Sequence, residues 1–238
     1  MKNLIKSPVF ILLILLLVSN FISDGFQDPL FWLEDKLMLL PAIVIGLSFH
    51  EFAHGWASHL LGDPTPKLQG RLTLNPLKHF DLFGFIALMV AGFGWGIPVE
   101  IDPRYYKHPR RDELIVSLAG VAMNFLIAVV FALILKVIFM FDYNFGSEGI
   151  SAILIEIITY IIEINVVLMV FNLLPIPPLD GFGIITQIFD LRKYSWYAPL
   201  YENGFTILLV LLLIGGVDKI IGYPIMWIYN MLIGIIVA

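Results

Sequence analysis

The sequence predicts an all-α, polytopic membrane protein with about six transmembrane helices. Hydrophobic residues make up 59% of its 238 residues, charged residues make up only 14%, and the mean hydropathy is +0.91. A soluble domain carries about 25% charged residues, so this chain has too few to cover a water-exposed surface. Apolar runs recur along the chain at close to the length of about 20 residues that a helix needs to cross a bilayer core.

The composition also excludes other classes of protein. Low charge and an aromatic content of 14% exclude a disordered chain. The absence of cysteine excludes a disulfide scaffold, a cysteine-ligated zinc site and a cysteine nucleophile. A net charge of −5 has the wrong sign for a nucleic-acid-binding surface, so we expect the lipid bilayer, and no nucleic acid, as a partner.

Six apolar runs account for the predicted spans. The first follows two lysines and is not followed by a small-residue cleavage site, so we expect an uncleaved signal anchor rather than a secretory signal peptide. The last two runs are short or interrupted. The six runs are residues 8–22, 37–61, 114–141, 150–174, 205–216 and 220–237.

A seventh apolar stretch, residues 82–99, is rich in glycine and ends close to a proline. This density of helix breakers argues against a regular spanning helix, so we expect a helix and a turn that dip into the membrane and return. If the N-terminus is cytoplasmic, this topology places 11 of the 14 lysine and arginine residues inside, all but Lys36, Lys136 and Lys219. The outer loop 23–36 is acidic, as the positive-inside rule allows.

His50, Glu51 and His54 form a metal-binding pattern in the second run. Residues four apart on a helix point from one face one turn apart, so both imidazoles can bind one zinc ion. Glu51 lies beside the first ligand, where it can act as general base on a metal-bound water. Ionisable residues inside a membrane are functional candidates by default; the alternative is that the histidines only hydrogen-bond to neighbouring helices.

A catalytic zinc site usually has three protein ligands, so one ligand must come from elsewhere in the chain. His59 faces away from the pair, and His79 and His108 lie in basic segments where we expect solvated or capping roles. Asp180 follows a proline-interrupted end of the fourth run, which returns to the half of the membrane that holds the histidines. We expect Asp180 to be the third ligand; the alternative is an exposed Asp-Gly turn.

These motifs resemble those of the site-2 protease family of intramembrane zinc metalloproteases, in its compact prokaryotic form. Residues 50–54 match the first motif of the family, and residues 172–181 match the second, with its Asn-x-x-Pro and Leu-Asp-Gly elements. Connecting segments at 62–64, 70–76 and 94–99 also resemble that subgroup, and the resemblance covers residues 37–190.

The resemblance implies a three-helix catalytic core and a re-entrant β-type loop, here ending near Val99, which guides an extended substrate by strand pairing. It implies substrate-binding roles for Asn172 and for Asn124, although Val121 stands where the family commonly has proline. The implied zinc ligands are His50, His54 and Asp180, and the implied catalytic base is Glu51.

The expected function is therefore zinc-dependent hydrolysis of a peptide bond within or next to a transmembrane segment of a membrane-protein substrate, as in regulated intramembrane proteolysis. We expect one domain over residues 1–238, with its core at about 37–190 and peripheral helices at about 8–22 and 205–237. It would lie in a prokaryotic inner membrane, with the site nearer the cytoplasm. The alternatives are a membrane metal-binding or transport protein and a catalytically silent scaffold.

Overall fold

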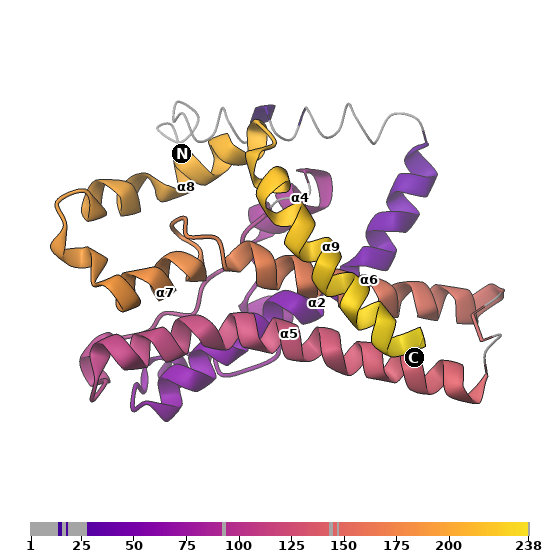
Figure 1. Cartoon of the computed structure of the whole chain (residues 1–238), viewed down its shortest axis with the longest axis horizontal. Coiled ribbons are helices and arrows are strands. Elements are labelled where there is room, and N and C mark those ends of the chain that lie inside the picture. The colour runs from indigo at the N-terminus through magenta and orange to yellow at the C-terminus, as the bar shows by residue number, and fades with distance from the viewer. Residues whose placement is uncertain are drawn as a thin grey trace.

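The computed structural model describes residues 28–91, 94–142, 145, 146 and 148–237, together with residues 14, 15 and 18. Apart from those last three residues, the predicted signal anchor at 8–22 lies outside the described part of the chain. Within that part the fold is all-helical, as predicted, and Figure 1 shows no strand. The helices are α2 (Pro29–Leu60), α3 (Thr65–Leu68), α4 (Leu82–Ala91), α5 (Pro109–Phe141), α6 (Gly149–Asn172), α7 (Asp180–Phe189), α8 (Tyr197–Leu213) and α9 (Gly216–Val237), with short 3₁₀ turns at Pro76–Lys78, Pro103–Tyr105 and Leu191–Lys193.

The start of α2 departs from the prediction, because residues 29–36 are helical rather than part of an outer loop. Asp28 caps this helix: its carboxylate accepts hydrogen bonds from the backbone N–H groups of Leu30 (3.2 Å) and Phe31 (3.1 Å). Pro29 then occupies the first helical position, where its missing N–H has no cost. This cap extends α2 about two turns beyond the apolar run that the sequence shows.

Three of the described helices are long and apolar enough to cross a membrane: α5, α6 and residues Gly216–Ile236 of α9. Helix α8 is apolar but shorter, with 17 residues. These helices indicate a membrane protein and confirm the third, fourth and last of the predicted runs as long apolar helices. The structure does not confirm the predicted number of six spans.

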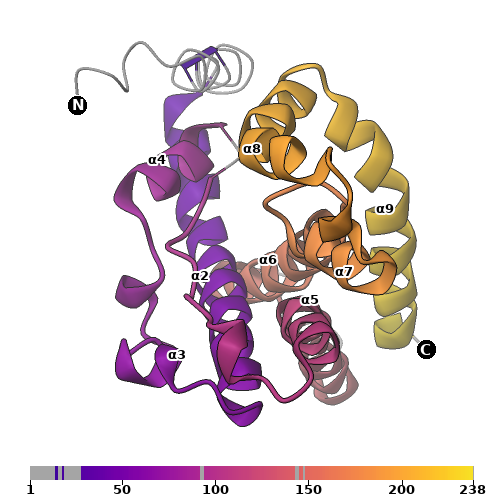
Figure 2. The ribbon, with the colours of Figure 1, turned by 90° about the vertical axis from the view of Figure 1, so that its left-hand side faces the viewer.

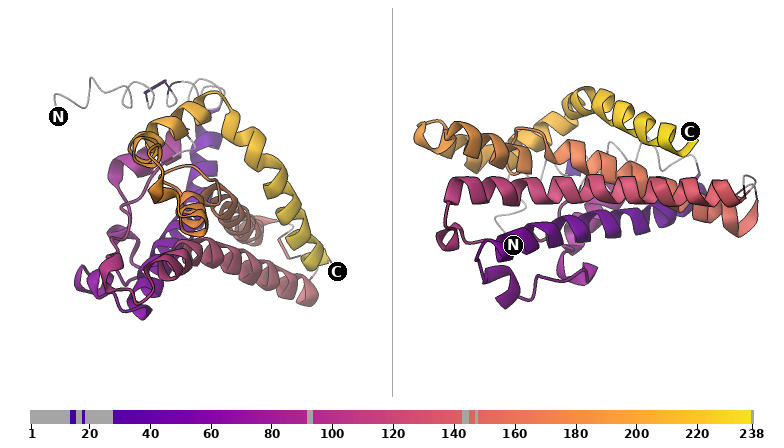
Figure 3. Two further views of the ribbon diagram at one scale, coloured as in Figure 1. Left: turned by 60° about the vertical axis from the view of Figure 1, so that its left-hand side comes forward. Right: turned by 60° about the horizontal axis from the view of Figure 1, so that its bottom comes forward.

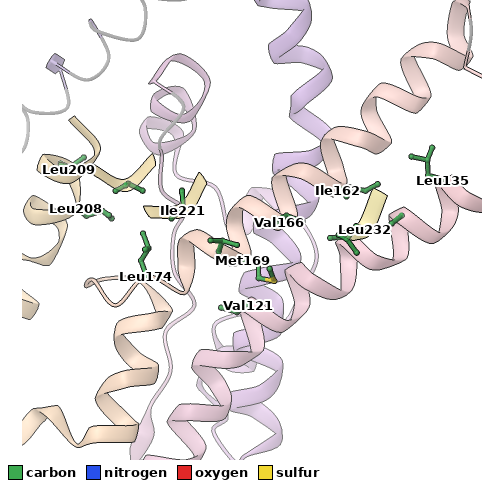
Figure 4. Close-up of a cluster of buried hydrophobic side chains, with 14 residues drawn as sticks. Val121, Leu135, Ile162, Val166, Met169, Leu174, Leu208, Leu209, Ile221 and Leu232 are labelled. Atoms are coloured by element: carbon green, nitrogen blue, oxygen red, sulfur yellow. The ribbon is translucent and has the colours of Figure 1, made fainter. Parts of the chain in front are cut away.

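Helices α2, α5 and α6 pack against one another and form the centre of the molecule (Figure 2). Helix α7 packs on the first half of α5, while α9 crosses both α5 and α6 (Figure 3). The hydrophobic core lies where α6 meets α5, α8 and α9, around fully buried residues such as Ile162, Val166 and Leu232 (Figure 4). Because helices in a membrane associate by close packing, this enclosure of α6 fixes the polar residues that it carries.

Within the predicted stretch 82–99, the structure describes a helix over residues 82–91 and an irregular segment over residues 94–99, not a regular spanning helix, as the glycine content predicts. After α4, residues 94–100 run as coil beside the segment that precedes α4. Ile97 N–H donates a hydrogen bond to the His79 carbonyl (2.7 Å), and Phe80 and Gly96 form an isolated antiparallel bridge. A Cβ on Gly84 would lie 2.0 Å from the Trp95 carbonyl oxygen, so glycine at this position allows the backbone at Trp95 to pass close to α4. The re-entrant β-type loop is therefore represented by one bridge in the described residues, and its passage into the membrane stays a prediction.

A buried carboxylate fastens the chain before α5 to the end of α2. Asp63 is fully buried and accepts hydrogen bonds from the Ser58 hydroxyl (2.7 Å) and from the backbone N–H groups of Thr65 (2.8 Å) and Asp102 (2.8 Å). Burial alone would raise the pKa of Asp63, but these donors hold it below its ordinary value of 3.8. The network sets where residues 99–106 lie beside α2.

We expect this network to make stability depend on pH. Since Asp63 binds a proton more weakly in the folded state, it stabilises the fold above pH 3.8, and this contribution is lost as the pH falls through the lower folded-state pKa. Asp63→Asn should lower the free energy of unfolding by about 2 kcal/mol at pH 7, the usual worth of hydrogen bonds to a charged group. Thermal unfolding in detergent should show that the stability difference between Asp63→Asn and the wild type shrinks in acid. The control Glu202→Gln, at an exposed position, should be as stable as the wild type at every pH. A stability difference for Asp63→Asn that does not change with pH would contradict the role of the carboxylate.

Candidate metal centre

Two histidines and one aspartate meet between α2 and α7. His50 Nε2 and His54 Nε2 lie 3.0 Å apart, and Asp180 Oδ2 is 3.2 Å from the first and 3.3 Å from the second. The histidines are one turn apart on α2, and Asp180 is the first residue of α7. In the part of the chain that the structure describes, these three side chains form a group that could hold a metal ion.

Each histidine is held through its other ring nitrogen. His50 Nδ1 lies 2.6 Å from the Asn124 side-chain oxygen, and His54 Nδ1 lies 2.7 Å from the Val116 backbone carbonyl oxygen. Both oxygens can only accept, so each Nδ1 must carry the hydrogen and donate it. When the imidazoles are neutral, each Nε2 therefore turns a lone pair toward Asp180, which is the tautomer that a metal ligand needs.

The three converging atoms are all acceptors, and this arrangement fits a cation. Asp180 Oδ2 is buried, and its neighbours are the two imidazole nitrogens; with neutral imidazoles, the carboxylate and the two lone pairs would repel one another unless a cation lay between them. Ligands placed tetrahedrally at 2.0–2.1 Å from zinc are about 3.3–3.4 Å apart. The separations of 3.0–3.3 Å between these atoms are close to that value.

Glu51 shares a cavity of about 230 Å³ with these three side chains. Its Oε2 accepts a hydrogen bond from the Val99 backbone N–H (2.9 Å), so the coil after α4 fixes its position. The cavity also touches α5 at Ser117 and the α6–α7 connection at Pro178. A carboxylate, three possible metal ligands and open space thus occur together.

The two predicted substrate-binding asparagines lie in different surroundings. Asn172, the last residue of α6, lines the cavity and donates a hydrogen bond from Nδ2 to the Leu168 carbonyl (3.0 Å). Asn124 is fully buried, and its oxygen faces His50. A role in substrate binding stays a prediction for both; the contacts of Asn124 show that it orients His50.

Polar contacts between α7 and α5 position Asp180. Glu113 of α5 accepts a hydrogen bond from Gln187 of α7 (2.7 Å) and pairs with Arg192 just beyond that helix. Arg110 of α5 donates to the Gln187 carbonyl (2.8 Å). Prolines end α6 as predicted, so the chain can turn and place the start of α7 at the histidines.

The remaining histidines lie away from this group. His59 Nδ1 is 3.3 Å from the Asp63 carbonyl, consistent with its expected exclusion. Of the two roles expected for His79, the solvated one is wrong, because the side chain is buried with Nε2 2.8 Å from the Thr73 carbonyl; His79 is, however, the C-cap residue of the Pro76–Lys78 turn. Its basic neighbours in the sequence gave no sign of the fold around it.

Sequence reasoning missed two residues of this centre. Gly120 lies where α5 passes the metal group, because a Cβ there would be 2.4 Å from His54 Nε2 and 2.7 Å from His50 Nε2. The second is Asn165 of α6, whose side-chain oxygen accepts a hydrogen bond from Asn124 Nδ2 (2.9 Å). An asparagine in the middle of an apolar helix was a signal that could have identified the second residue.

Gly120→Ala should weaken zinc binding by at least about tenfold, the order found when the surroundings of metal-binding histidines are disturbed. The new methyl group must displace the imidazoles, since contacts this short do not occur. Zinc affinity, measured by competition with a chelator, should fall in this variant and stay unchanged in Gly222→Ala, where a Cβ meets nothing within 4 Å. Equal zinc affinity in both variants would show that the close packing of α5 against His50 and His54 does not affect metal binding.

Comparison with known proteins finds relatives that are named zinc metalloproteases. Residues 38–215 match the model of peptidase family M50. The chain is 40% identical over 184 residues to "Putative zinc metalloprotease YwhC" of Bacillus subtilis, covering 74% of this chain and 81% of that protein. It is 27% identical over 234 residues to "Putative zinc metalloprotease Rip2" of Mycolicibacterium smegmatis, covering 94% and 86%. No solved structure matches the chain significantly.

Proposed function

Because the chain belongs to peptidase family M50, we propose that it is a zinc-dependent endopeptidase that cleaves a membrane protein within or next to a transmembrane segment. The observation that carries this proposal is the convergence of His50 Nε2, His54 Nε2 and Asp180 Oδ2 within 3.3 Å of one another, beside the carboxylate of Glu51. The relatives named zinc metalloproteases support the choice of metal.

In this proposal His50, His54 and Asp180 hold the zinc ion. When bound, zinc supplies a Lewis acid that activates water and polarises the scissile carbonyl. The tautomers favour this role, because the Nδ1 hydrogens go to Asn124 and Val116 and leave both Nε2 atoms for the metal. The first helix of the core thus supplies two ligands, and the start of α7 supplies the third.

Glu51 carries the proton from the attacking water to the leaving amine. The backbone N–H of Val99 holds its Oε2, and we assign Oε1 to the transfer: it takes a proton from the attacking water and returns it to the leaving amine. A general base of this kind usually accelerates a reaction by about 10²–10⁴-fold.

The coil after α4 and Asn172 would hold the substrate. A helical substrate keeps its carbonyl groups in intrahelical hydrogen bonds, so the segment to be cleaved must become extended. Pro98 and Val99 line the cavity, and we propose that the coil leading to them pairs with the extended substrate by β-augmentation. We assign residues 93–99 to this pairing segment, of which residue 93 lies outside the described residues. Asn172 meets the same cavity from α6.

We also propose that the chain crosses a prokaryotic inner membrane about six times, with the site nearer the cytoplasm. The distribution of lysine and arginine supports this orientation. His54 contacts Val116, which lies seven residues after Pro109 at the start of α5, or about 10 Å along the helix. Arg110 and Arg111 stand at that same end of α5, where the cytoplasmic surface would be.

Zinc content and cleavage of a model transmembrane substrate, measured on the same purified protein, test the proposal. The expected result is about one zinc ion per chain and cleavage that stops on chelation and returns with zinc. A metal-binding or transport protein would hold zinc without cleaving, and a silent scaffold would cleave nothing in any metal state.

A further inference from the structure

Asn165 is a fully buried amide in the middle of α6, and the mechanism above does not use it. A buried amide is unfavourable in apolar surroundings unless its polar atoms are paired. The structure pairs both ends: Nδ2 donates to the Ile161 carbonyl of its own helix (2.8 Å), and Oδ1 accepts from Asn124 Nδ2 of α5 (2.9 Å).

The hydrogen bonds from Asn165 to the metal group can run in only one direction. The Ile161 carbonyl only accepts, so the nitrogen of Asn165 must face it and the oxygen must face Asn124. Asn124 then turns its nitrogen to Asn165 and to the Gly46 carbonyl (3.1 Å), which leaves its oxygen for His50 Nδ1 at 2.6 Å. Reversing either amide would place like groups against each other.

The hydrogen bonds that lead from Asn165 through Asn124 to His50, called the relay below, connect all three central helices. Asn165 lies on α6, Asn124 on α5, and both Gly46 and His50 on α2. A Cβ at Gly46 would lie 2.6 Å from Leu168 Cδ1, so glycine allows α2 to approach α6 closely at this level. The amide of Asn165 is therefore held by helix packing as well as by its own hydrogen bonds.

We propose that Asn165 is a positioning residue of the metal site. It holds the amide of Asn124, which in turn fixes the ring orientation and the Nδ1–H tautomer of His50. The inference rests on the proposed zinc site. Loss of a partner that orients a metal-binding histidine weakens metal binding by about 10–100-fold; because Asn165 acts through Asn124, we expect about tenfold.

Three variants on α6 test the relay. Asn165→Leu removes both polar ends at similar size. Asn165→Asp, protonated when buried, keeps an acceptor for Asn124 and a donor for the Ile161 carbonyl. Thr159→Val is the matched control, because Thr159 donates to the Ile155 carbonyl of its own helix (2.8 Å), as Asn165 does to Ile161.

The measurement is the zinc affinity of each apoprotein in detergent, by competition with a chromogenic chelator. We expect about tenfold weaker binding in Asn165→Leu, recovery to within about threefold in Asn165→Asp, and no change in Thr159→Val. In an Asn124→Ala background, Asn165→Leu should cause no further loss, because the two residues act in series.

Wild-type affinity in Asn165→Leu, or a full additional loss in the Asn124→Ala background, would overturn the inference. If circular dichroism shows that the leucine variant does not fold, Asn165→Ser takes its place with the same expectations. A wild-type protein that binds no zinc would refute the proposed function itself, so the two failures are distinguishable.

Discussion

Glu51→Gln should reduce cleavage of a model transmembrane substrate by about 10²–10⁴-fold while bound zinc stays at the wild-type level. Glutamine keeps the size of the side chain and an oxygen that can accept the hydrogen bond from the Val99 N–H, but it cannot take a proton from water. The loss should therefore fall on turnover and not on metal binding. Mass spectrometry of the products, with zinc analysis of the same sample, checks both.

The same substitution at Glu156 is a suitable control. Glu156 is exposed on α6 and does not line the cavity described above, so Glu156→Gln should cleave at the wild-type rate. Substantial turnover by a pure Glu51→Gln preparation would mean that another group accepts the proton, and the assignment of Glu51 would then fail.

Asp180→Ala should remove zinc from the purified protein. The substitution deletes one of three converging ligand atoms and leaves the two imidazoles on α2 with no partner from α7. Loss of a ligand should exceed the 10–100-fold effect of losing a ligand's own partner, so we expect zinc affinity to fall by more than about 100-fold. Competition titration against a chelator measures this directly.

Asp218→Ala controls for the removal of an acidic residue from the first turn of a helix, because Asp218 stands in the first turn of α9. Zinc affinity should be unchanged in that variant, and circular dichroism should be the same for both. An Asp180→Ala protein with full zinc affinity would exclude Asp180 as a ligand and would favour the alternative that it only forms an Asp-Gly turn.

The sequence was sufficient to identify the candidate ligands because their geometry is local or follows from a helix break. The four-residue spacing of His50 and His54 places both on one helix face, and the prolines before Asp180 predict the end of α6. The contacts that surround them are not local. That Val99 would reach Glu51, or that Gly120 would leave room for the imidazoles, depends on how separate segments pack.

The same distinction holds for the fold. The apolar runs 114–141 and 150–174 predicted α5 and α6 to within a few residues, since hydropathy changes sharply at their ends. The start of α2 was missed because the polar residues 34–36 resemble a loop, although the Asp28 cap continues the helix through them. Asn124 was predicted to bind substrate from the family resemblance alone, and its position behind His50 became visible only with three helices in place.

Comparative proteomics of membranes from cells that carry the wild-type chain or Glu51→Gln tests the central claim most directly. We expect at least one membrane-anchored protein or fragment to accumulate in the variant, and its cleavage product, with a new terminus within or next to a transmembrane segment, to occur only with the wild type. Identical membrane proteomes, with no such terminus in either, would contradict the proposal that this chain is an intramembrane zinc protease.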